Sequence, residues 1–378
     1  MLVAMMDNKY ISLTSDYSRE QLLKLRKQRN FICPQCKSEL QLKVGKVKIP
    51  HFAHLPDAMC HNLFSEGESE THLLGKLTLY DFFKKANKQV ILEPFLTSLS
   101  QRPDLFVNDQ NRLYAIEFQC SSIDSDLFMK RNSSYIQNGI QPFWVLKTPN
   151  KYGEEMSRIT VVSLSKFEQQ FIIKDDYNHY LLTFHPQTKI FYYFSHLIHL
   201  KNNQFITEIH RLPLQFQTFP FLKPKRPSFS QFLSILKIYK KRTQTYVENK
   251  IYTSSKGVND ILMRSIYELK LNRYLLPIFI GVPTKYAMYM EVVAVEWQTA
   301  LFYYCQIYQK QVLQFTMYDM EHFIKWLKLE LSNEKIQAVN SYIQLLKELA
   351  INNVNIKISE QIVFEKLYKQ LVAICSEN

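Results

Sequence analysis

No stretch of the sequence is apolar for long enough to span a membrane. The most apolar segment, residues 275–304, is interrupted by Lys285, Glu291 and Glu296, whereas a spanning helix needs about 20 predominantly apolar residues. The opening residues also lack the charged segment and apolar run of a secretory signal. We therefore expect a cytoplasmic protein without a membrane span.

Cysteine is scarce, with six in 378 residues, and internal repeats and long low-complexity tracts are absent from the sequence. Two of the cysteines form a Cys-x-x-Cys pair, which in a chain without an export signal favours metal binding over a disulfide. The length is enough for two or three domains, and a hydrophobic content of 46% supplies their cores.

Basic residues exceed acidic ones, with 47 Lys and Arg against 34 Asp and Glu and a formal net charge of +13. Such a balance is typical of proteins that bind nucleic acid or another polyanion, but a solvated lysine-rich surface accounts for it equally well. The 23 Tyr and 26 Phe could offer stacking surfaces for bases, although we expect most of them in the core.

We predict an α/β protein in three parts: a small N-terminal zinc-finger-like domain at 1–64, a mixed-sheet domain at 65–150 and a C-terminal β-hairpin and helical region at 151–378. In the middle part, apolar periodicity predicts helices over 66–87 and 124–138 and strands over 90–95, 104–107, 113–119 and 142–146. This order implies a central mixed sheet with helices on its faces.

The C-terminal part changes character along its length. Residues 159–222 are aromatic and β-prone, with a hairpin turn at 185–188, and the Pro-rich, basic residues 212–229 are typical of a linker. Beyond Ser228 the pattern is mainly helical, most clearly over 332–349 and 359–373.

Residues 31–62 are rich in cysteine, histidine, proline and lysine and show little periodicity. Cys33 and Cys36 have the spacing of a zinc knuckle, and His51 and His54 supply a second pair, with Cys60 as a credible substitute for one histidine. Free thiols beside surface histidines are the alternative. Because this polar segment lacks core residues, we expect a structural zinc ion to organise it, without a part in catalysis.

Glu68, His72 and Lys76 are spaced at i, i+4 and i+8, which places all three on one face of the predicted helix at 66–87. An isolated face of this kind is most often simply solvated. It gains interest here because a pair of carboxylates follows it in the sequence.

Asp104 begins one predicted strand and Glu117 lies within the next, and a turn at 108–111 brings the two together. Glu117 stands in an otherwise apolar strand, where an unpaired charge is costly. A Mg²⁺ or Mn²⁺ ion held by Asp104 and Glu117 would neutralise that charge. Such an ion also activates water and stabilises charge on phosphate.

This arrangement resembles the PD-(D/E)xK, or restriction-endonuclease-like, superfamily, in which a helix with an acid precedes a hairpin with Asp and Glu-x-Lys. Gln119 stands where that superfamily usually has Lys. A glutamine can orient water but supplies no positive charge, so Lys76 or His72 would have to supply that charge. The resemblance implies catalytic roles for Glu68, His72, Lys76, Asp104, Glu117 and Gln119.

Over about residues 1–150 the chain more closely resembles the competence protein CoiA family. The matching residues are Cys33 and Cys36, His51 and His54, Glu68 through His72 with Lys76, Arg102 through Asp104, Glu117 through Ser121, Arg131 with Tyr135, Gly139 and the strand at 143–145.

The family resemblance implies a cytoplasmic metal-dependent DNA endonuclease or exonuclease. Its substrate would be incoming DNA or recombination intermediates, single-stranded or branched, during transformation, in contact with the RecA recombinase machinery. The candidates for DNA contact are Arg102, Ser121, Arg131 and Tyr135. For Arg131 and Tyr135, a plain helix surface with one buried Tyr is equally consistent with the pattern, and Ser121 could instead cap a helix.

Two other functions remain open. The first is a nuclease-fold protein with weak or lost chemistry that binds DNA as a recombination mediator, which the Gln119 substitution keeps in view. The second is a zinc-containing regulator that reads duplex DNA, which is weaker because the sequence shows no recognition helix and leaves Glu117 unexplained.

Overall fold

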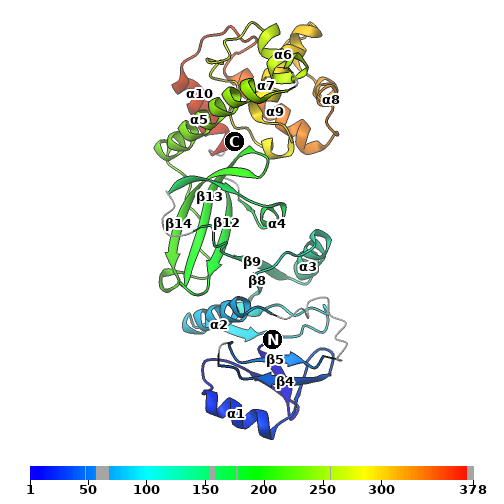
Figure 1. The fold of residues 1–378 in the computed structure, drawn as a ribbon, viewed down its shortest axis with the longest axis vertical. Coiled ribbons are helices and arrows are strands. Elements are labelled where there is room, and N and C mark those ends of the chain that lie inside the picture. Colours follow the sequence, from blue (N-terminus) through cyan, green and yellow to red (C-terminus); the bar gives the residue numbers. More distant parts are fainter. Residues whose placement is uncertain (47, 57–67, 153–157, 176–177, 256, 373–378) are drawn as a thin grey trace.

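The computed structural model describes residues 1–46, 48–56, 68–152, 158–175, 178–255 and 257–372. Figure 1 shows an elongated molecule with a small sheet at its N-terminal end, a large sheet in the middle and a group of helices at the far end. The predicted α/β class, with a mixed sheet followed by a helical C-terminal region, is confirmed.

The N-terminal part is a five-stranded antiparallel sheet in the order β2-β1-β3-β4-β5. Its helix α1 starts at a reciprocal cap, because the hydroxyl of Ser18 accepts from the Gln21 amide and the Gln21 side chain accepts from the Ser18 amide. The elements are β1 (Val3–Met6), β2 (Lys9–Ser12), α1 (Arg19–Gln28), β3 (Phe31–Ile32), β4 (Glu39–Lys43) and β5 (His51–His54).

The prediction that residues 31–62 lack core residues was wrong. Phe31, Leu40, Leu42 and Phe52 are all buried, because they alternate with polar residues along β3, β4 and β5 and so face one side of the sheet. Apolar burial therefore organises the described part of this segment. Residues 57–62, Cys60 among them, lie outside the described residues.

The predicted order of helix, three strands, helix and strand in the middle part is confirmed. Strands β6, β7 and β8 pair antiparallel, and β9 pairs parallel to β8. Helix α2 packs on the face of β8 that carries Phe118, and α3 packs on the face that carries Ala115. The elements are α2 (Glu70–Lys85), β6 (Gln89–Leu92), β7 (Leu105–Asp109), β8 (Arg112–Gln119), α3 (Ser125–Gln137) and β9 (Ile140–Lys147).

The sheet continues beyond β9. Strand β12 pairs parallel to β9, and beyond β12 the sheet continues with β13, then β14, then β10. Strand β11 pairs with β12. The predicted division at residue 150 therefore falls between strands of one sheet. The hairpin predicted at 185–188 is the β12–β13 connection. The elements are β10 (Ile159–Ser163), α4 (Lys166–Gln169), β11 (Ile173–Asp175), β12 (Asn178–His185), β13 (Ile190–Lys201) and β14 (Gln204–Pro213).

The composition of residues 212–229 predicted a linker, but this segment also packs against the large sheet. Phe219 and Phe221 are buried. The ring of Phe219 lies 4.9 Å from that of Phe83 on α2, and the ring of Phe221 lies 4.7 Å from that of Phe143 on β9. The segment therefore covers the α2 face of the large sheet before the chain enters the helical region.

The helical region surrounds α7, whose residues are almost all buried. The helices predicted at 332–349 and 359–373 are confirmed as α9 and α10, which Ser332 and Ser359 cap. The helices are α5 (Phe229–Thr253), α6 (Ile261–Glu268), α7 (Ala294–Ile307), α8 (Met317–Trp326), α9 (Asn333–Glu348) and α10 (Glu360–Leu371), with short 3₁₀ turns at Leu214–Phe216, Gly257–Asn259, Ala287–Tyr289 and Val312–Gln314.

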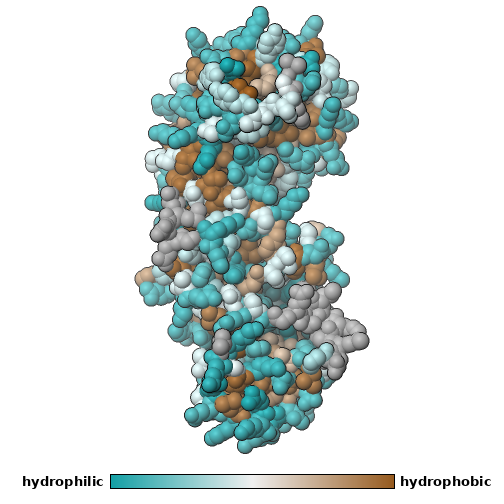
Figure 2. Space-filling view, in the orientation of Figure 1, coloured by the Kyte–Doolittle hydropathy of each residue, from teal (hydrophilic) through white to brown (hydrophobic). Residues whose placement is uncertain are grey.

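The surface is mainly hydrophilic on the face that Figure 2 shows, with hydrophobic patches reaching the surface over the C-terminal half. Within the described ranges, none of the helices combines the length and apolar character needed to cross a bilayer.

Gly75 allows α2 to lie directly on β8, because a Cβ at this position would overlap the ring of Phe118. We expect Gly75→Ala to lower the free energy of unfolding by about 1–3 kcal/mol through overpacking, against the usual gain for Ala over Gly within a helix. Denaturant unfolding measures the change. The matched control is Gly45→Ala, whose Cβ meets no atom closer than 3.9 Å, and equal stability of the two variants would contradict the close contact.

Candidate functional site

A buried lysine on α2 gathers three carboxylates. The Lys76 side chain is fully buried, and its Nζ lies 2.8 Å from Oε1 of Glu68 and 3.7 Å from Oδ1 of Asp104, and also contacts Glu93. Burial alone would lower the pKa of Lys76, but the surrounding carboxylates outweigh burial and raise it. Lys76 therefore stays charged and holds together residues from α2, β6 and the start of β7.

Glu68 reaches Lys76 from just outside the helix. The predicted helix contained Glu68, but α2 begins at Glu70, because the hydroxyl of Ser69 accepts from the His72 amide and caps the helix there. Burial favours the neutral form of Glu68, but the Lys76 ammonium outweighs burial and lowers the pKa of the carboxyl. Glu68 and Lys76 are thus together, as predicted, although only His72 and Lys76 share the helix.

Glu93 is a member of this cluster that the sequence analysis missed. It follows β6 with φ +45°, its side chain is buried, and its Oε1 and Oε2 each lie 3.0 Å from the amide nitrogen of Leu2. Despite burial, Lys76 lowers the pKa of Glu93. The available signal was an acid directly after the apolar run 90–92, the same kind of signal that identified Glu117.

His72 and Asp104 form a second contact between α2 and the hairpin. Nε2 of His72 lies 3.1 Å from Oδ2 of Asp104, and the same oxygen accepts from the Phe118 amide at 2.8 Å. Burial opposes charge on both groups, but their attraction raises the pKa of His72 and, with Lys76, lowers the pKa of Asp104 to about 2. The side chains of His72 and Asp104 are 20% and 16% exposed, and that of Glu68 is 15% exposed, so solvent reaches the cluster at these three residues.

Glu117 is held from the other face of the sheet. Its carboxylate contacts Arg131, and the Tyr135 hydroxyl donates to Oε1 at 2.7 Å. Arg131 lies 5.5 Å from the ring centroid of Trp144. Burial raises the pKa of Glu117 even though Arg131 and Tyr135 oppose the shift, and repulsion from Asp104 adds to it.

The hairpin register brings Asp104 and Glu117 to neighbouring positions. Leu105 pairs with Ile116, so Asp104 lies opposite Glu117 one step before β7 begins. Asp104 is engaged by α2, however, while Glu117 is engaged by α3. The structure therefore brings the predicted pair together at the sheet end but gives each carboxylate its own cationic partner.

The other predicted site residues lie around this pair. Gln119 donates from Nε2 to the carbonyl oxygen of Ser121 at 2.7 Å, and Ser121 is exposed. Arg102 is half-buried, with its guanidinium 3.7 Å from the Met1 sulfur. Arg131 and Tyr135 are both buried. Of the four predicted DNA contacts, Ser121 is thus the most open to solvent, and Arg131 and Tyr135 are occupied with Glu117.

A separate group in the N-terminal sheet could hold a metal ion. The ligand atoms of Cys33, Cys36 and His54 lie within 4.8 Å of one another, with Sγ of Cys36 3.3 Å from Nε2 of His54. Burial raises the pKa of the Cys33 thiol. Burial also opposes charge on Cys36, but hydrogen bonds, the largest from Ser38, outweigh it and lower the pKa of Cys36 to about 6. Among the described residues, this is the one group of three or more such side chains that meets the geometry of a metal site.

His51 is not a member of this group, in contrast to its prediction as a zinc ligand. Its Nδ1 lies 2.8 Å from the carbonyl oxygen of Ile49. His51 and His54 are three residues apart on β5, and side chains at that separation in a strand point to opposite faces. Cys60, the predicted substitute, lies outside the part of the chain that the structure describes.

Comparisons with known proteins match most of the chain to one family. The N-terminal domain of competence protein CoiA matches residues 14–63, its nuclease-like domain matches 68–227 and its C-terminal domain matches 235–365. The competence protein CoiA of Bacillus subtilis (strain 168) is 35% identical over 191 residues, which cover 50% of this chain and 49% of that protein. The match thus spans about half the length of that curated relative. No solved structure matches the chain.

The Cys33, Cys36 and His54 group predicts the outcome of a metal analysis. We expect the purified chain to carry one tightly bound divalent ion, with zinc as the predicted identity, and expect Cys33→Ser and His54→Ala to lose it. His51→Ala is the matched control and should keep the metal, because His51 faces away. Elemental analysis by mass spectrometry measures the content, and loss of the metal from His51→Ala would overturn the ligand assignment.

The Lys76 cluster predicts a large, pH-dependent loss of stability. Lys76→Met leaves Glu68, Glu93 and Asp104 without their shared cation, which should cost about 3–5 kcal/mol at neutral pH. Carboxyls with a lowered pKa stabilise the folded state above their unfolded pKa and lose this contribution as pH falls through the lowered value. The difference from wild type should therefore hold from pH 7 to about 5 and shrink as pH falls from about 4, the unfolded pKa of Asp and Glu, towards 2. Denaturant unfolding at several pH values in a chelator checks this, and a pH-independent difference would contradict it.

Proposed function

Because this chain belongs to the competence protein CoiA family, we propose that it hydrolyses DNA phosphodiester bonds with a Mg²⁺ or Mn²⁺ ion. The incoming DNA or recombination intermediates of transformation, single-stranded or branched, would be the substrate. The observation that supports this most directly is the pair of His72 and Asp104, 3.1 Å apart, at a sheet end where Asp104 lies opposite Glu117 and beside the buried Lys76.

The donor set at this place suits a hard divalent cation. Asp104 and Glu117 are carboxylates at neighbouring positions, and after burial, repulsion from Asp104 contributes to the raised pKa of Glu117, a repulsion that a shared cation would relieve. Asp104 and Glu117 would hold the ion, with Glu117 turning from Arg131 towards it. When bound, such an ion supplies Lewis acidity and a more acidic water.

Three groups of the chain would orient the metal ligands, move a proton and supply positive charge at the site. The Phe118 amide fixes Asp104 by hydrogen bonding to its Oδ2. His72 sits on the exposed side of Asp104 and can hold or accept a proton there. Lys76 supplies the positive charge that Gln119 lacks in the Glu-x-Gln motif, and its carboxylate partners keep it protonated.

We propose DNA as the partner on the strength of the chain's basic character and its nuclease-like domain. Ser121, at the end of β8, is the exposed candidate for a phosphate contact. Arg102, Arg131 and Tyr135 would meet phosphate only if they left their present surroundings, so we assign Arg131 and Tyr135 to positioning Glu117. Contact with the RecA recombinase machinery, a cytoplasmic location and a structural zinc remain part of this proposal.

The second candidate is a DNA-binding recombination mediator with weak or lost chemistry. It is favoured by the engagement of Glu117 with Arg131 and Tyr135, and of Gln119 with the carbonyl of Ser121. In this arrangement the carboxylate has a cation and the amide cannot orient water without moving. Both candidates use the same fold and differ only in whether a metal displaces Arg131 from Glu117.

The decisive test compares cleavage of single-stranded, duplex and branched DNA by the full chain with Mg²⁺ or Mn²⁺. We expect cleavage in wild type and at least a hundredfold loss in Asp104→Asn and Glu117→Gln, since each removes a proposed metal ligand. Asp109→Asn is the matched control, because Asp109 lies at the far end of β7 and pairs with Lys88 at 2.7 Å. Product release from labelled DNA gives the rates.

The two candidates predict different results. DNA binding without cleavage in wild type, unchanged in Asp104→Asn, supports the mediator and overturns hydrolysis. Cleavage that survives in both Asp104→Asn and Glu117→Gln would place the chemistry elsewhere in the molecule.

A further inference from the structure

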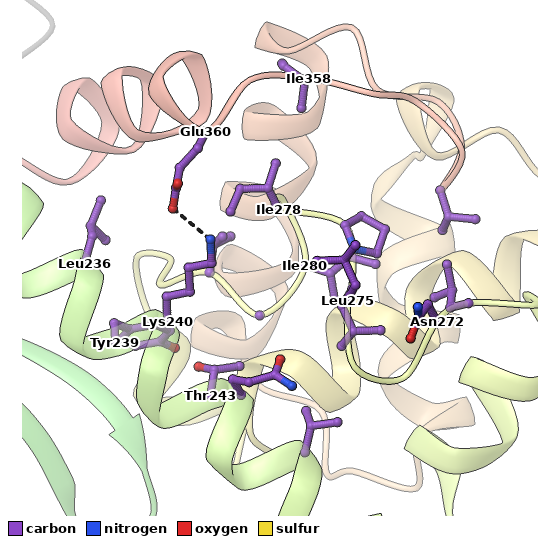
Figure 3. A pocket seen from close by; sticks show the side chains of 18 of the residues that line it. Leu236, Tyr239, Lys240, Thr243, Asn272, Leu275, Ile278, Ile280, Ile358 and Glu360 are labelled. Carbon is purple, nitrogen blue, oxygen red and sulfur yellow. Dashed lines mark hydrogen bonds and ion pairs between the residues drawn. The ribbon is translucent and has the colours of Figure 1, made fainter.

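The C-terminal helical region contains a large groove that the proposed nuclease site does not use. It has a volume of about 1000 Å³ and lies between α5, residues 270–283 and the segment that leads into α10. Figure 3 shows side chains from these three segments facing one space. A volume of this size accommodates several side chains of a bound segment.

The floor of the groove is aliphatic. Its apolar members come from all three walls and include Leu236, Ile278, Ile280, Ile356, Ile358 and Leu367. Leu275 stands at the edge with 77% of its surface exposed. Leu275 extends the aliphatic lining to the surface, and a contiguous apolar patch rimmed by polar residues is typical of a surface that a partner covers.

The edge of the groove is basic. Lys237 and Lys241 on α5, with Lys270 and Lys357 on the loops, all line it and are exposed. Within the residues that the structure describes, none of these four has an ion-pair partner. The nearby Lys240 is paired with Glu360 at 2.9 Å, as Figure 3 shows, so the edge carries about four uncompensated positive charges.

Hydrogen bonds from α7 and α9 hold the wall of the groove formed by residues 270–283. The Gln298 side chain accepts from the amides of Gly281 and Val282 at 2.7 and 3.0 Å and donates to the Val282 carbonyl at 2.8 Å. The Tyr342 hydroxyl donates to the Phe279 carbonyl at 2.9 Å. Gly281, at φ +74°, lets α5 approach closely, because a Cβ there would lie 2.8 Å from Cγ2 of Thr243. The groove is thus preformed, which lowers the cost of binding.

We propose that this groove binds an acidic amphipathic helix of a partner protein. Apolar residues at i, i+3 or i+4, and i+7 of that helix would enter the aliphatic floor, and Asp or Glu on its flanks would meet the four lysines. The position of the lysines outside the apolar strip matches this pattern of side chains. The proposal does not depend on the nuclease function.

Two other occupants suit the groove less well. Single-stranded DNA needs a series of exposed aromatic surfaces for successive bases. Tyr274 in the lining is 49% exposed, but Tyr239 and Phe364 are only 2% and 6% exposed, so the groove offers a single ring for stacking. A second copy of this chain has a formal net charge of +13, so it would bring positive charge to a basic edge. Charge complementarity therefore favours an acidic peptide.

The test selects binders from a displayed library of random 16-residue peptides on the full-length chain. We expect enriched peptides to carry acidic residues interleaved with apolar ones at helical spacing. The best peptide, synthesised and labelled, should bind at least tenfold more weakly to the triple variant Lys237→Glu, Lys241→Glu, Lys357→Glu in fluorescence anisotropy. Leu275→Ser should also weaken binding, and its exposure means that the fold will tolerate it.

The matched control is Lys24→Glu, Lys325→Glu, Lys347→Glu, which changes the net charge equally at exposed lysines outside the groove. This variant should bind the peptide like wild type, and thermal unfolding of all variants excludes a loss of fold. Three outcomes overturn the proposal: no enrichment of acidic peptides, peptide binding that survives the groove variant, and a groove variant that loses only binding of a 20-nucleotide oligothymidine or only self-association in sedimentation.

Discussion

The burial of Lys76 among carboxylates is the interaction on which the rest of the site depends. One ammonium joins Glu68 before α2, Glu93 after β6 and Asp104 before β7, so three separate chain segments are fixed at one point. Such a cluster gains little net stability over an apolar core, but it breaks at a high cost when one partner is removed. The position of Asp104, and with it the His72 contact, is therefore set by a charge that never reaches solvent.

The order of elements from 66 to 147 could be predicted because apolar periodicity and turn residues determine it locally. The same local reasoning found Glu117, since a carboxylate in an apolar strand requires a partner. It could not identify that partner as Arg131 with Tyr135, because the choice between a metal and a guanidinium depends on how α3 packs. The continuation of the sheet through β12 was likewise hidden, since the parallel pairing of β9 and β12 joins strands that the sequence separates by a change in composition.

The predicted histidine pair shows how local structure decides which side chains can share one ligand group. Taken as a loop, residues 51–54 allow both histidines to face one ion. Taken as a strand, the same residues send His51 and His54 to opposite sides, and the buried Phe52 between them was the signal for the strand. The structure therefore brings together Cys33, Cys36 and His54 from the predicted ligand set, and strand geometry separates His51 from them.

Glu93 links the two sheets in a way that bears on the proposed chemistry. Its carboxylate accepts from the Leu2 amide, and the apolar core beneath α2 is continuous with that of the N-terminal sheet. The N-terminal sheet, which carries the group of Cys33, Cys36 and His54, thus forms one wall of the Lys76 cluster. On the opposite side of the large sheet, Arg131 and Tyr135 of α3 hold Glu117. An ion that draws Glu117 towards Asp104 would have to compete with Arg131 and Tyr135, while the α2 side stays fixed. Lys76 fixes the α2 side at three chain segments, whereas Arg131 and Tyr135 hold Glu117 on the α3 side, so the proposed ion would have to replace only the contacts from α3.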